Sequence, residues 1–447
     1  MKPFFNRLFF VIFITVGTSM AAWSNDYIEI ANATDLQKIG HDEAYPLNGH
    51  YILMSDIDLE QVDDWIPIGS LDANDKNPRN FDGVLNGNGY SIKNLTITTS
   101  TNFRGLFGRL YHAVVKDLDL VDVDIVGLAP TGGVTGAMIG ESIIERVSVS
   151  GNIIGGSEIG GSEIGGIAGR IARDPTFTGY NIIRDCYVTA DITATKRSTD
   201  MNQPSVAGGI AAFSHATTET GSGKIDIRRC YVAGSVISLE NEDVAGNATG
   251  ILTFYDGHHF IKMEELIVLC DTIGAATSSL FFSRRGPTYD QFELFDKMYA
   301  RTGIELFYLV ENNKGRGGEI PDGVIHYNPL ETYKTKAFYD ENLSWDFEDV
   351  WTITEGSLPV LKRVHGPISQ NIDPKASDNC KISVKSGVLE IEPYTTISVY
   401  VFDMTGSKVY TAEHVSSKIL VDKLPEGIYV VQTQDELVKN IEKVWLR

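Results

Sequence analysis

An unusual spacing of apolar and polar positions recurs along the first two-thirds of the chain. Each copy has an apolar residue, two polar or charged residues, a second apolar residue, one residue of any kind and a third apolar residue. The six copies are residues 92–97, 115–120, 144–149, 183–188, 227–232 and 263–268. Self-similarity with a period of about 20 to 50 residues is typical of stacked repeat proteins. We therefore expect one continuous array.

Within one copy, the pattern predicts a strand with a corner in it. In the fourth copy the last three positions alternate, which places Cys186 and Val188 on one face and Tyr187 on the other. Arg184 and Asp185 interrupt the alternation, and a bend with both side chains outward explains the interruption. Equivalent positions lie 23, 29, 39, 44 and 36 residues apart, and the shortest spacing suffices for one coil of a parallel β-helix. We therefore predict an all-β chain, with a right-handed parallel β-helix (solenoid) followed by a small antiparallel β-sandwich.

A second series of short motifs, each beginning with glycine, recurs along the same part of the chain. Its members are residues 83–85, 105–108, 133–136, 166–169, 209–212 and 250–252. Glycine at the same place in every coil indicates a backbone that turns tightly or packs closely there. This series predicts a second strand in each coil, with the glycine at a corner.

The second polar position of the first pattern alternates in charge along the chain. It reads Asn94, Asp117, Arg146, Asp185, Arg229 and Glu265. If the coils stack about 4.8 Å apart, equivalent residues form a column in which opposite charges are neighbours on the outer surface. An exposed pair is worth only about 0–1 kcal/mol, so we expect the column to set the register of the coils more than their stability.

The sequence divides into four parts. Residues 1–22 have the order of basic residues, apolar stretch and small residues that is typical of a secretory signal. Residues 23–366 form the predicted solenoid with its closing segment, and residues 367–379 a linker. Residues 380–447 contain short strands separated by turns, which predicts the sandwich.

Parts of the predicted solenoid depart from the repeat. No copy is recognisable in residues 280–335. Within them, Phe292, Phe295 and Met298 have helical spacing, so we expect a short helix that covers an end of the solenoid. The duplicated, glycine-rich segment 155–165 has no Lys-Ser/Thr after it, so it predicts a flexible loop rather than a phosphate-binding cradle.

Two regions resemble known families. Residues 81–95, the Gly-Leu-Phe-Gly motif at 105–108 and its later copies are similar to GLUG-motif repeat proteins, many of which are bacterial surface proteins. Residues 338–361 resemble the unit that closes such arrays. Residues 399–409 and 424–431 resemble the C-terminal sorting domain of the type nine secretion system of Bacteroidetes, which implies export to the cell surface.

Composition narrows the compartment and the partners. Lys+Arg number 38 against 59 Asp+Glu, a formal charge of −21, which repels nucleic acid phosphates. After the signal no stretch reaches the roughly 20 apolar residues of a spanning helix. We expect an exported monomer at the cell surface or outside the cell, associated with the outer membrane. The four cysteines lack metal-ligand spacing, and Cys186 and Cys230 share one inward position, so we expect them to be buried apolar residues and predict no cofactor.

One group of residues is a candidate for catalysis. Asp117, Asp119, Asp122 and Asp124 alternate with apolar residues, and carboxylates that share a face can perform general acid/base chemistry or bind calcium. The sequence contains no recognisable calcium loop, and a fold alone does not imply activity. We interpret the four as the solvated face of a strand, and predict no catalytic or metal-binding residues. The histidine pair at 258–259 is interpreted as part of an ordinary loop.

The candidate ligand surface consists of Tyr187, Tyr231 and Asp119. The two tyrosines occupy equivalent outward positions in adjacent coils, so their rings can stack as a platform for sugar rings or protein side chains. The alternative is a packing pair beneath a loop. Four insertions are expected to form a rim around such a surface. They are residues 153–163, 195–206, 214–224 and 239–248.

The leading hypothesis is a secreted or cell-surface, adhesin-like binding protein that presents a β-helix face and loops to a glycan or protein ligand. One alternative is a polysaccharide lyase or glycoside hydrolase on the same scaffold. Another is a structural spacer at the cell surface.

Overall fold

The computed structural model describes most of the repeat region and the strands of the C-terminal region. The described residues are 27–69, 79–98, 101–156, 162–172, 179–195, 205–215, 223–239, 246–255, 259–275, 277–285, 291–307, 325–363, 380–385, 388–393, 397–403, 408–421, 424–425, 427–434 and 439–446. The expected signal and linker lie outside these residues, as do the central parts of the four insertions.

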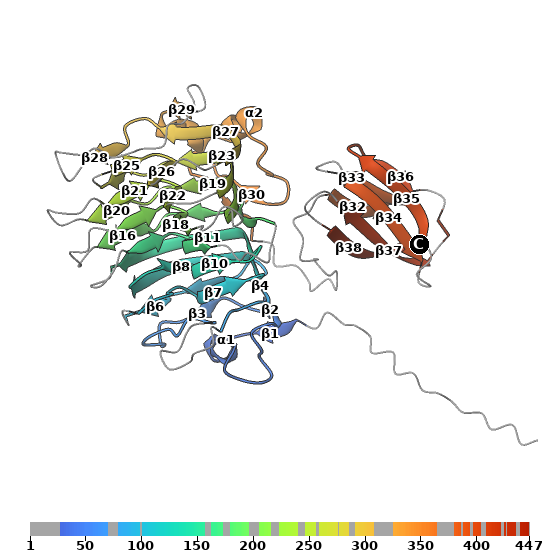
Figure 1. Ribbon diagram of the computed structural model, residues 1–447, viewed down its shortest axis with the longest axis horizontal. Helices are drawn as coiled ribbons and strands as arrows, with labels where there is room; N and C mark the ends of the chain where they lie inside the picture. Colours follow the sequence, from blue (N-terminus) through green and yellow to red (C-terminus); the bar gives the residue numbers. More distant parts are fainter. Residues whose placement is uncertain are drawn as a thin grey trace, which may run out of the picture.

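Parallel strands make up the repeat region (Figure 1). They lie in three sheets, of which the largest runs the length of the stack. The largest sheet holds β1 (Ile28–Ile30), β2 (His50–Leu53), β3 (Ile57–Asp58), β4 (Val84–Asn86), β5 (Ser91–Lys93), β6 (Thr96–Ile97), β8 (Val114–Gly127), β11 (Ile143–Gly155), β14 (Asn181–Arg184), β15 (Tyr187–Val188), β16 (Asp191–Thr195), β19 (Gly223–Val232), β20 (Val236–Leu239), β23 (His259–Val268), β24 (Thr272–Gly274), β27 (Gln291–Arg301), β28 (Glu305–Phe307) and β29 (Ile325–Asn328).

The other two sheets complete each repeat. The second holds β7 (Phe107–Tyr111), β10 (Thr135–Ile139), β13 (Ala168–Ala172), β18 (Ala211–His215), β22 (Leu252–Tyr255) and β26 (Phe282–Arg285). The third holds β9 (Thr131–Gly132), β12 (Glu163–Gly165), β17 (Val206–Gly208), β21 (Asn247–Thr249) and β25 (Thr277–Ser279).

Neighbouring strands within each sheet come from successive repeats. Leu118 in β8 pairs with Val147 in β11, and Cys230 in β19 pairs with Leu266 in β23. These four residues and Cys186 are each at most 1% exposed. The predicted in-register stacking is therefore observed from residue 115 onward.

Asn94 does not belong to the column in which the sequence pattern places it. In the largest sheet Ile92 pairs with Leu120, whereas the partner of Val115 is Leu85. The first predicted copy is thus displaced by one corner. The displacement arises because β8 has two left-handed corner residues, each within a similar run of apolar and polar positions.

The strand β27 (Gln291–Arg301) lies where the sequence pattern predicts a helix. Phe295 pairs with Met263, and Met298 pairs with Leu266. The helix prediction is wrong, and so is the expectation that residues 280–335 contain no repeat, because this strand is a further copy in register with the copy before it.

One residue forms the corner of each copy. These corner residues are Asp117, Arg146, Asp185, Arg229, Glu265 and Lys297. All six have left-handed φ angles between 51° and 56°, a conformation that L-residues adopt singly and at some cost. The bend predicted at residues 184–185 is confirmed, and it resides in the second of the two polar residues.

From residue 105 onward, the glycine series marks a corner and the start of the strand that follows it, and these strands form the second sheet. Gly166 lies between β12 and β13, where an added Cβ would come within 2.2 Å of the carbonyl oxygen of Gly209 and 2.7 Å of Cγ1 of Val188. At Gly209 the same construction meets the carbonyl oxygen of Gly250 at 2.0 Å. The close packing expected from the sequence therefore explains these glycines.

The duplicated segment 155–165 is only partly a loop. Its last residues form β12, which pairs with β9 and β17. Residues 157–161 lie outside the described part of the chain.

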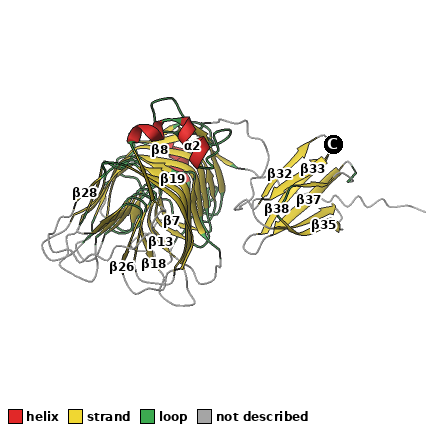
Figure 2. Ribbon diagram, turned by 90° about the horizontal axis from the view of Figure 1, so that it is seen from above, coloured by secondary structure: helices red, strands yellow, loops and turns green. Residues whose placement is uncertain are grey.

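The strands of the repeat region are arranged around one interior (Figure 2). Apolar side chains from all three sheets fill it. Leu120, Met138 and Ile164, one from each sheet, are fully buried there. Cys186 and Cys230 are also buried, and both are free thiols. Burial raises the pKa of Cys186 well above its usual value, so this sulfur acts as a small apolar group.

Short helices lie at the two ends of the stack. α1 (Ala33–Lys38) inserts Leu36 into the apolar interior at the first end. At the other end, η1 (Leu330–Lys334) and α2 (Lys336–Asn342) lead to a hairpin of β30 (Trp351–Thr352) and β31 (Val360–Leu361). We call residues 330–363 the closing segment. It includes the stretch that resembles the closing unit of GLUG arrays.

The C-terminal region consists of two antiparallel sheets. Its strands are β32 (Cys380–Lys385), β33 (Val388–Pro393), β34 (Ile397–Asp403), β35 (Lys408–Val415), β36 (Ile419–Val421), β37 (Gly427–Gln434) and β38 (Lys439–Leu446). β32, β33 and β36 form one sheet, and the other four strands form the second. Leu389, Val399, Val421 and Val431 belong to one buried cluster that both sheets share, as expected for two sheets packed face to face.

Candidate functional site

The tyrosine pair singled out in the sequence forms a stack but is not a free platform. The rings of Tyr187 and Tyr231 are 5.0 Å apart and 2° from parallel. The closing segment covers them: Trp351 lies 6.3 Å from each ring, and Tyr231 donates a hydrogen bond to the carbonyl oxygen of Pro359 at 2.8 Å. Tyr231 is 2% exposed, so the prediction of a solvent-facing ring pair is wrong, and the alternative of a covered packing pair is observed.

Opposite charges pair along the column of corner residues. Arg146 contacts both carboxylate oxygens of Asp117, at 2.5 and 3.1 Å. Arg229 binds Asp185 in the same bidentate manner, at 2.6 and 2.8 Å. The alternation continues into the copy that the sequence pattern does not reveal, where Lys297 contacts Glu265 at 2.8 Å.

The column is less exposed than the sequence pattern suggests. Asp185 and Glu265 are 5% and 2% exposed. Burial by itself would lower the pKa of Arg229, but the hydrogen bond and charge of Asp185 outweigh it and raise that pKa above its usual value. Breaking a buried pair costs about 3–5 kcal/mol, because one charge is left without compensation. These pairs therefore bear on stability as well as register.

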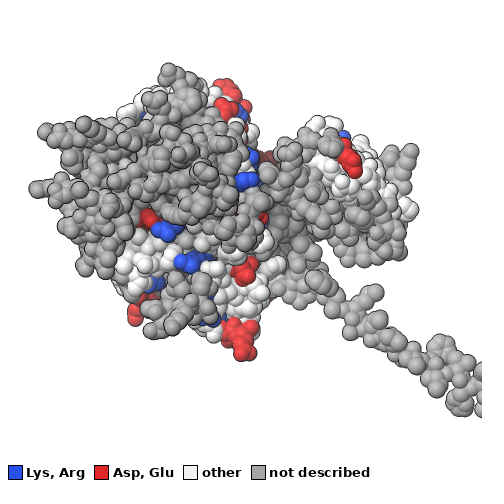
Figure 3. All heavy atoms as spheres, viewed as in Figure 1, with Lys and Arg blue, Asp and Glu red and all other residues white. Residues whose placement is uncertain are grey.

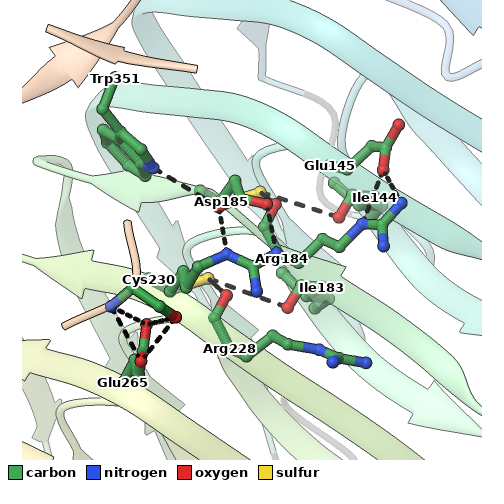
Figure 4. Close-up of polar contacts among 12 residues, drawn as sticks. Ile144, Glu145, Ile183, Arg184, Asp185, Arg228, Cys230, Glu265 and Trp351 are labelled. Atoms are coloured by element: carbon green, nitrogen blue, oxygen red, sulfur yellow. Dashed lines mark hydrogen bonds and ion pairs between the residues drawn. The ribbon is translucent and has the colours of Figure 1, made fainter. Parts of the chain in front are cut away.

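The closing segment is hydrogen-bonded to this column (Figure 4). The backbone amide and hydroxyl of Ser344 donate to the carboxylate of Glu265 at 2.8–3.0 Å. Trp351 Nε1 lies 3.5 Å from Oδ1 of Asp185. A buried aromatic cluster that includes Trp345 and Tyr339 fills the space between these contacts.

A second buried ion-pair network lies beside the column. Glu145 contacts Arg184 at 2.7 Å (Figure 4) and Arg146 at 2.8 Å. Burial alone would raise the pKa of Glu145, but the two guanidinium groups outweigh it and lower that pKa to about 2. Glu145 therefore remains ionised throughout the neutral range.

A cavity of about 300 Å³ opens between the closing segment and the first repeats. Its lining residues are Asn86, Asn88, Gly89, Asp117, Leu118, Asp119, Arg146, Asp349, Val350, Leu361, Lys362 and Arg363. We call it the junction pocket. Its volume is at the lower end of the range typical of small-molecule sites, and most of its lining side chains are polar or charged.

The acidic row divides between the junction pocket and the open surface. Asp117 and Asp119 line the pocket, whereas Asp122, at the second corner of β8, and Asp124, two residues beyond it, are exposed. Asp119 is buried, accepts a hydrogen bond from Ser148, and contacts Arg363 at 2.6 Å. The interpretation of all four as a solvated face thus fails for Asp119, which holds the end of the closing segment instead.

The sequence pattern indicates Asp119 as part of a ligand surface but does not reveal the residues of the closing segment that lie beside it. Arg363, Lys362 and Asp349 belong to the closing segment, more than 200 residues away in the sequence, and they follow no local motif. The one available signal is the resemblance of residues 338–361 to a closing unit, which indicates a segment that folds back on the stack.

Metal-ligating side chains and surface charges are two further features of the described residues. Among the described residues, no group of three or more His, Cys, Asp or Glu side chains is placed to hold a metal ion. His259 is the first residue of β23, and His258 lies outside the described residues. Figure 3 shows acidic and basic side chains close to one another at several places on one face.

Two known proteins are similar to parts of this chain. A crystal structure described as "a putative immunoglobulin A1 protease from Bacteroides ovatus" matches 76% of this chain and 93% of its own, with a TM-score of 0.50 and 18% identity, a level that shows the fold alone. Halomucin of Haloquadratum walsbyi is 31% identical over 157 residues, which are 32% of this chain and 2% of Halomucin. This chain therefore matches only a small fraction of that relative's length.

No helix among the described residues is long and apolar enough to cross a membrane.

The C-terminal region matches a family model. Residues 376–447 match the secretion system C-terminal sorting domain, in agreement with the resemblance seen in the sequence. The chain therefore carries a sorting domain of the type nine secretion system and is exported to the cell surface or the extracellular space.

Proposed function

We propose that this chain is a cell-surface or secreted binding protein of the adhesin type. In this proposal the stacked repeats wind as a right-handed parallel β-helix of the GLUG kind, and the protein acts as a monomer. Its ligand is a glycan or a protein, held at the junction pocket and the adjoining lateral face. The sorting domain supports the location, and the pocket supports the binding role.

The observation that carries the proposal is the composition of the junction pocket. The pocket combines amide, carboxylate and guanidinium groups with the apolar side chain of Leu118. Such a mixture of groups fixes the orientation of a polar ligand. Asp119 and Arg363 join its two walls through their ion pair. A preformed wall reduces the entropy lost on binding.

A polysaccharide lyase or glycoside hydrolase is the second candidate, because two carboxylates, Asp117 and Asp119, line the same pocket. Both are bound to guanidinium groups, Asp117 to Arg146 and Asp119 to Arg363. A carboxylate engaged by a guanidinium group must break that charge-assisted contact before it can act on a substrate. This pairing favours binding over hydrolysis. A surface spacer is the third candidate, and it would need no pocket.

The test exposes the purified full chain to an array of glycans and matrix proteins, beside a reducing-end assay on the same polysaccharides. We expect saturable binding to at least one ligand and no release of reducing ends. Release of reducing ends that is lost in Asp119→Asn would instead establish the enzyme. If the array shows neither binding nor turnover, the spacer becomes the better account.

A further inference from the structure

We infer that the junction pocket binds an uncharged, polyhydroxylated unit, such as one or two residues of a neutral glycan. This inference rests on the proposed binding function and specifies its ligand. It follows from three properties of the pocket: its charges cancel, it retains a donor on Asn86 and an acceptor on Asp349 without protein partners among the described residues, and most of its lining residues are polar or charged.

The charges around the pocket cancel. Three lining residues are acidic and three are basic. Arg146 is neutralised by Asp117 and also by Glu145, and Arg363 is neutralised by Asp119. An anionic sugar would have to compete with these carboxylates for the two guanidinium groups, and the formal charge of −21 on the chain opposes its approach. Uronate and sulfated units are therefore disfavoured.

Hydrogen-bonding capacity remains on both walls. Asn86 uses its Oδ1 to accept from the backbone amide of Asn88 at 2.8 Å. Among the described residues nothing accepts a hydrogen bond from its side-chain NH₂ group, and nothing donates to the carboxylate of Asp349. A hydroxyl group both donates and accepts, so vicinal hydroxyls of a sugar can satisfy both groups at once.

The lining also argues against a protein side chain as the occupant. Only Leu118, Val350 and Leu361 are apolar among the lining residues, and Leu118 is 1% exposed. Protein interfaces place apolar and aromatic anchors in pockets that are correspondingly apolar. A polar occupant of the size of a sugar ring is a better match to this wall.

Two nearly isosteric substitutions test the charge of the ligand. Asn86→Asp preserves the oxygen that accepts from Asn88 but replaces the donor and adds a negative charge. Asp349→Asn replaces one of the two acceptor oxygens by an NH₂ donor and removes a negative charge. Glu348→Gln, in the same turn as Asp349 but outside the lining, and Asn152→Asp, on the exposed face of β11, are the matched controls. All four variants should melt within a few degrees of the wild type.

The probes are neutral cellohexaose, xylohexaose and mannohexaose, anionic hexagalacturonate and heparin hexasaccharide, and cationic chitosan hexasaccharide, each titrated against the full chain. We expect at least one neutral probe to bind. Both pocket variants should weaken it about tenfold, because each exchanges a donor for an acceptor or the reverse, so that the sugar hydroxyl bound there must reverse its role and give up its hydrogen bond to a neighbouring group, and both controls should leave it unchanged.

The direction of the two effects separates the outcomes. An anionic ligand in this pocket would bind more tightly to Asp349→Asn and less tightly to Asn86→Asp, and a cationic ligand would reverse this; either result overturns the inference. Neutral binding that neither variant changes also overturns it. Binding to a matrix protein alone refutes this inference but leaves the proposed function standing, whereas no binding to any probe or protein refutes both.

Discussion

At the scale of single residues, the corners combine backbone strain with charge compensation. Arg229 and Lys297 have left-handed φ angles of 51° and 52°, which cost roughly 1–2 kcal/mol in residues other than glycine. Glycine would avoid this cost but could not pair with the neighbouring carboxylate. The buried ion pairs therefore account for why charged residues, rather than glycines, stand at these corners.

Two glutamates at equivalent positions should respond to pH in opposite directions. The pKa of Glu145 is lowered to about 2. Because that is below its ordinary value of 4.5, the stability it contributes is present above about pH 5 and is lost as the pH falls toward 2. Glu145→Gln should therefore be less stable than the wild type at pH 7, by about 3 kcal/mol at most, and should lose less stability on acidification. Urea unfolding at several pH values measures this.

Glu264→Gln is the matched comparison. Burial raises the pKa of Glu264, and the neighbouring charge of Glu265 adds to the effect. A raised carboxyl pKa makes stability fall as the pH rises above its ordinary value, so Glu264→Gln should be more stable than the wild type at pH 7. The same direction of change in both variants would contradict the burial and pairing described for these positions.

At the scale of elements, the corner residues form a column in which a charged residue inside the column interacts electrostatically with the corner residues of both adjacent coils. Asp185 is bound by Arg229, and the charge of Asp185 also acts on Arg146 one rung earlier. The column is therefore a chain of interactions rather than a set of isolated pairs.

An exchange of charges tests that chain. Asp185→Arg alone should destabilise the stack by about 3–5 kcal/mol, because it buries a positive charge between two others. Adding Arg229→Asp restores the pair but places the introduced arginine beside Arg146 and the introduced aspartate beside Glu265. The double variant should therefore recover little stability in a double-mutant cycle measured by urea unfolding. Near-complete recovery would show that the pairs are independent.

The closing segment should detach without unfolding the stack. Trp351 is fully buried and lies 4.4 Å from Trp345. Trp351→Ala should cost about 3–5 kcal/mol locally, which would speed hydrogen exchange in residues 330–363 more than in β8 or β11. Val360→Ala is the control, because Val360 is 43% exposed in the adjacent strand. Equal acceleration in β8 would show that the segment and the stack unfold together.

Much of this architecture could be predicted from the sequence, because a strand with a corner at a fixed place repeats the same spacing of inward apolar residues in every coil. The same regularity caused the errors. A corner places two polar residues between two apolar positions, so Phe295 and Met298 are three residues apart in the sequence and imitate the spacing of a helix. Two corners of similar pattern in β8 displaced Asn94 from its column. The junction pocket had no local signal, because Asn86 and Asp349 meet only through the folding back of the closing segment.

At the scale of the whole molecule, the sorting domain and the repeat region have separate roles. The sorting domain accounts for export, and the proposed ligand contacts all lie in the repeat region and its closing segment. Location and binding should therefore be separable by deletion.

Removal of residues 376–447 tests this separation. In the native cell the truncated chain should no longer reach the cell surface or the medium, as measured by fractionation and surface proteolysis. The purified truncated chain should keep the same glycan-array profile as the full chain. A truncated chain that still reaches the surface would contradict the assignment of export to the matched domain.

The closing segment touches rungs that are far apart in the stack. Arg363 reaches Asp119, Trp351 reaches Asp185, and Ser344 reaches Glu265. Because the closing segment has a fixed length between these three contacts, it constrains the distance between the coils that it contacts. Gene duplication that inserted one more coil between residues 119 and 265 would move the anchor points about 4.8 Å further apart, so the protein can lengthen only outside this interval unless the closing segment lengthens as well.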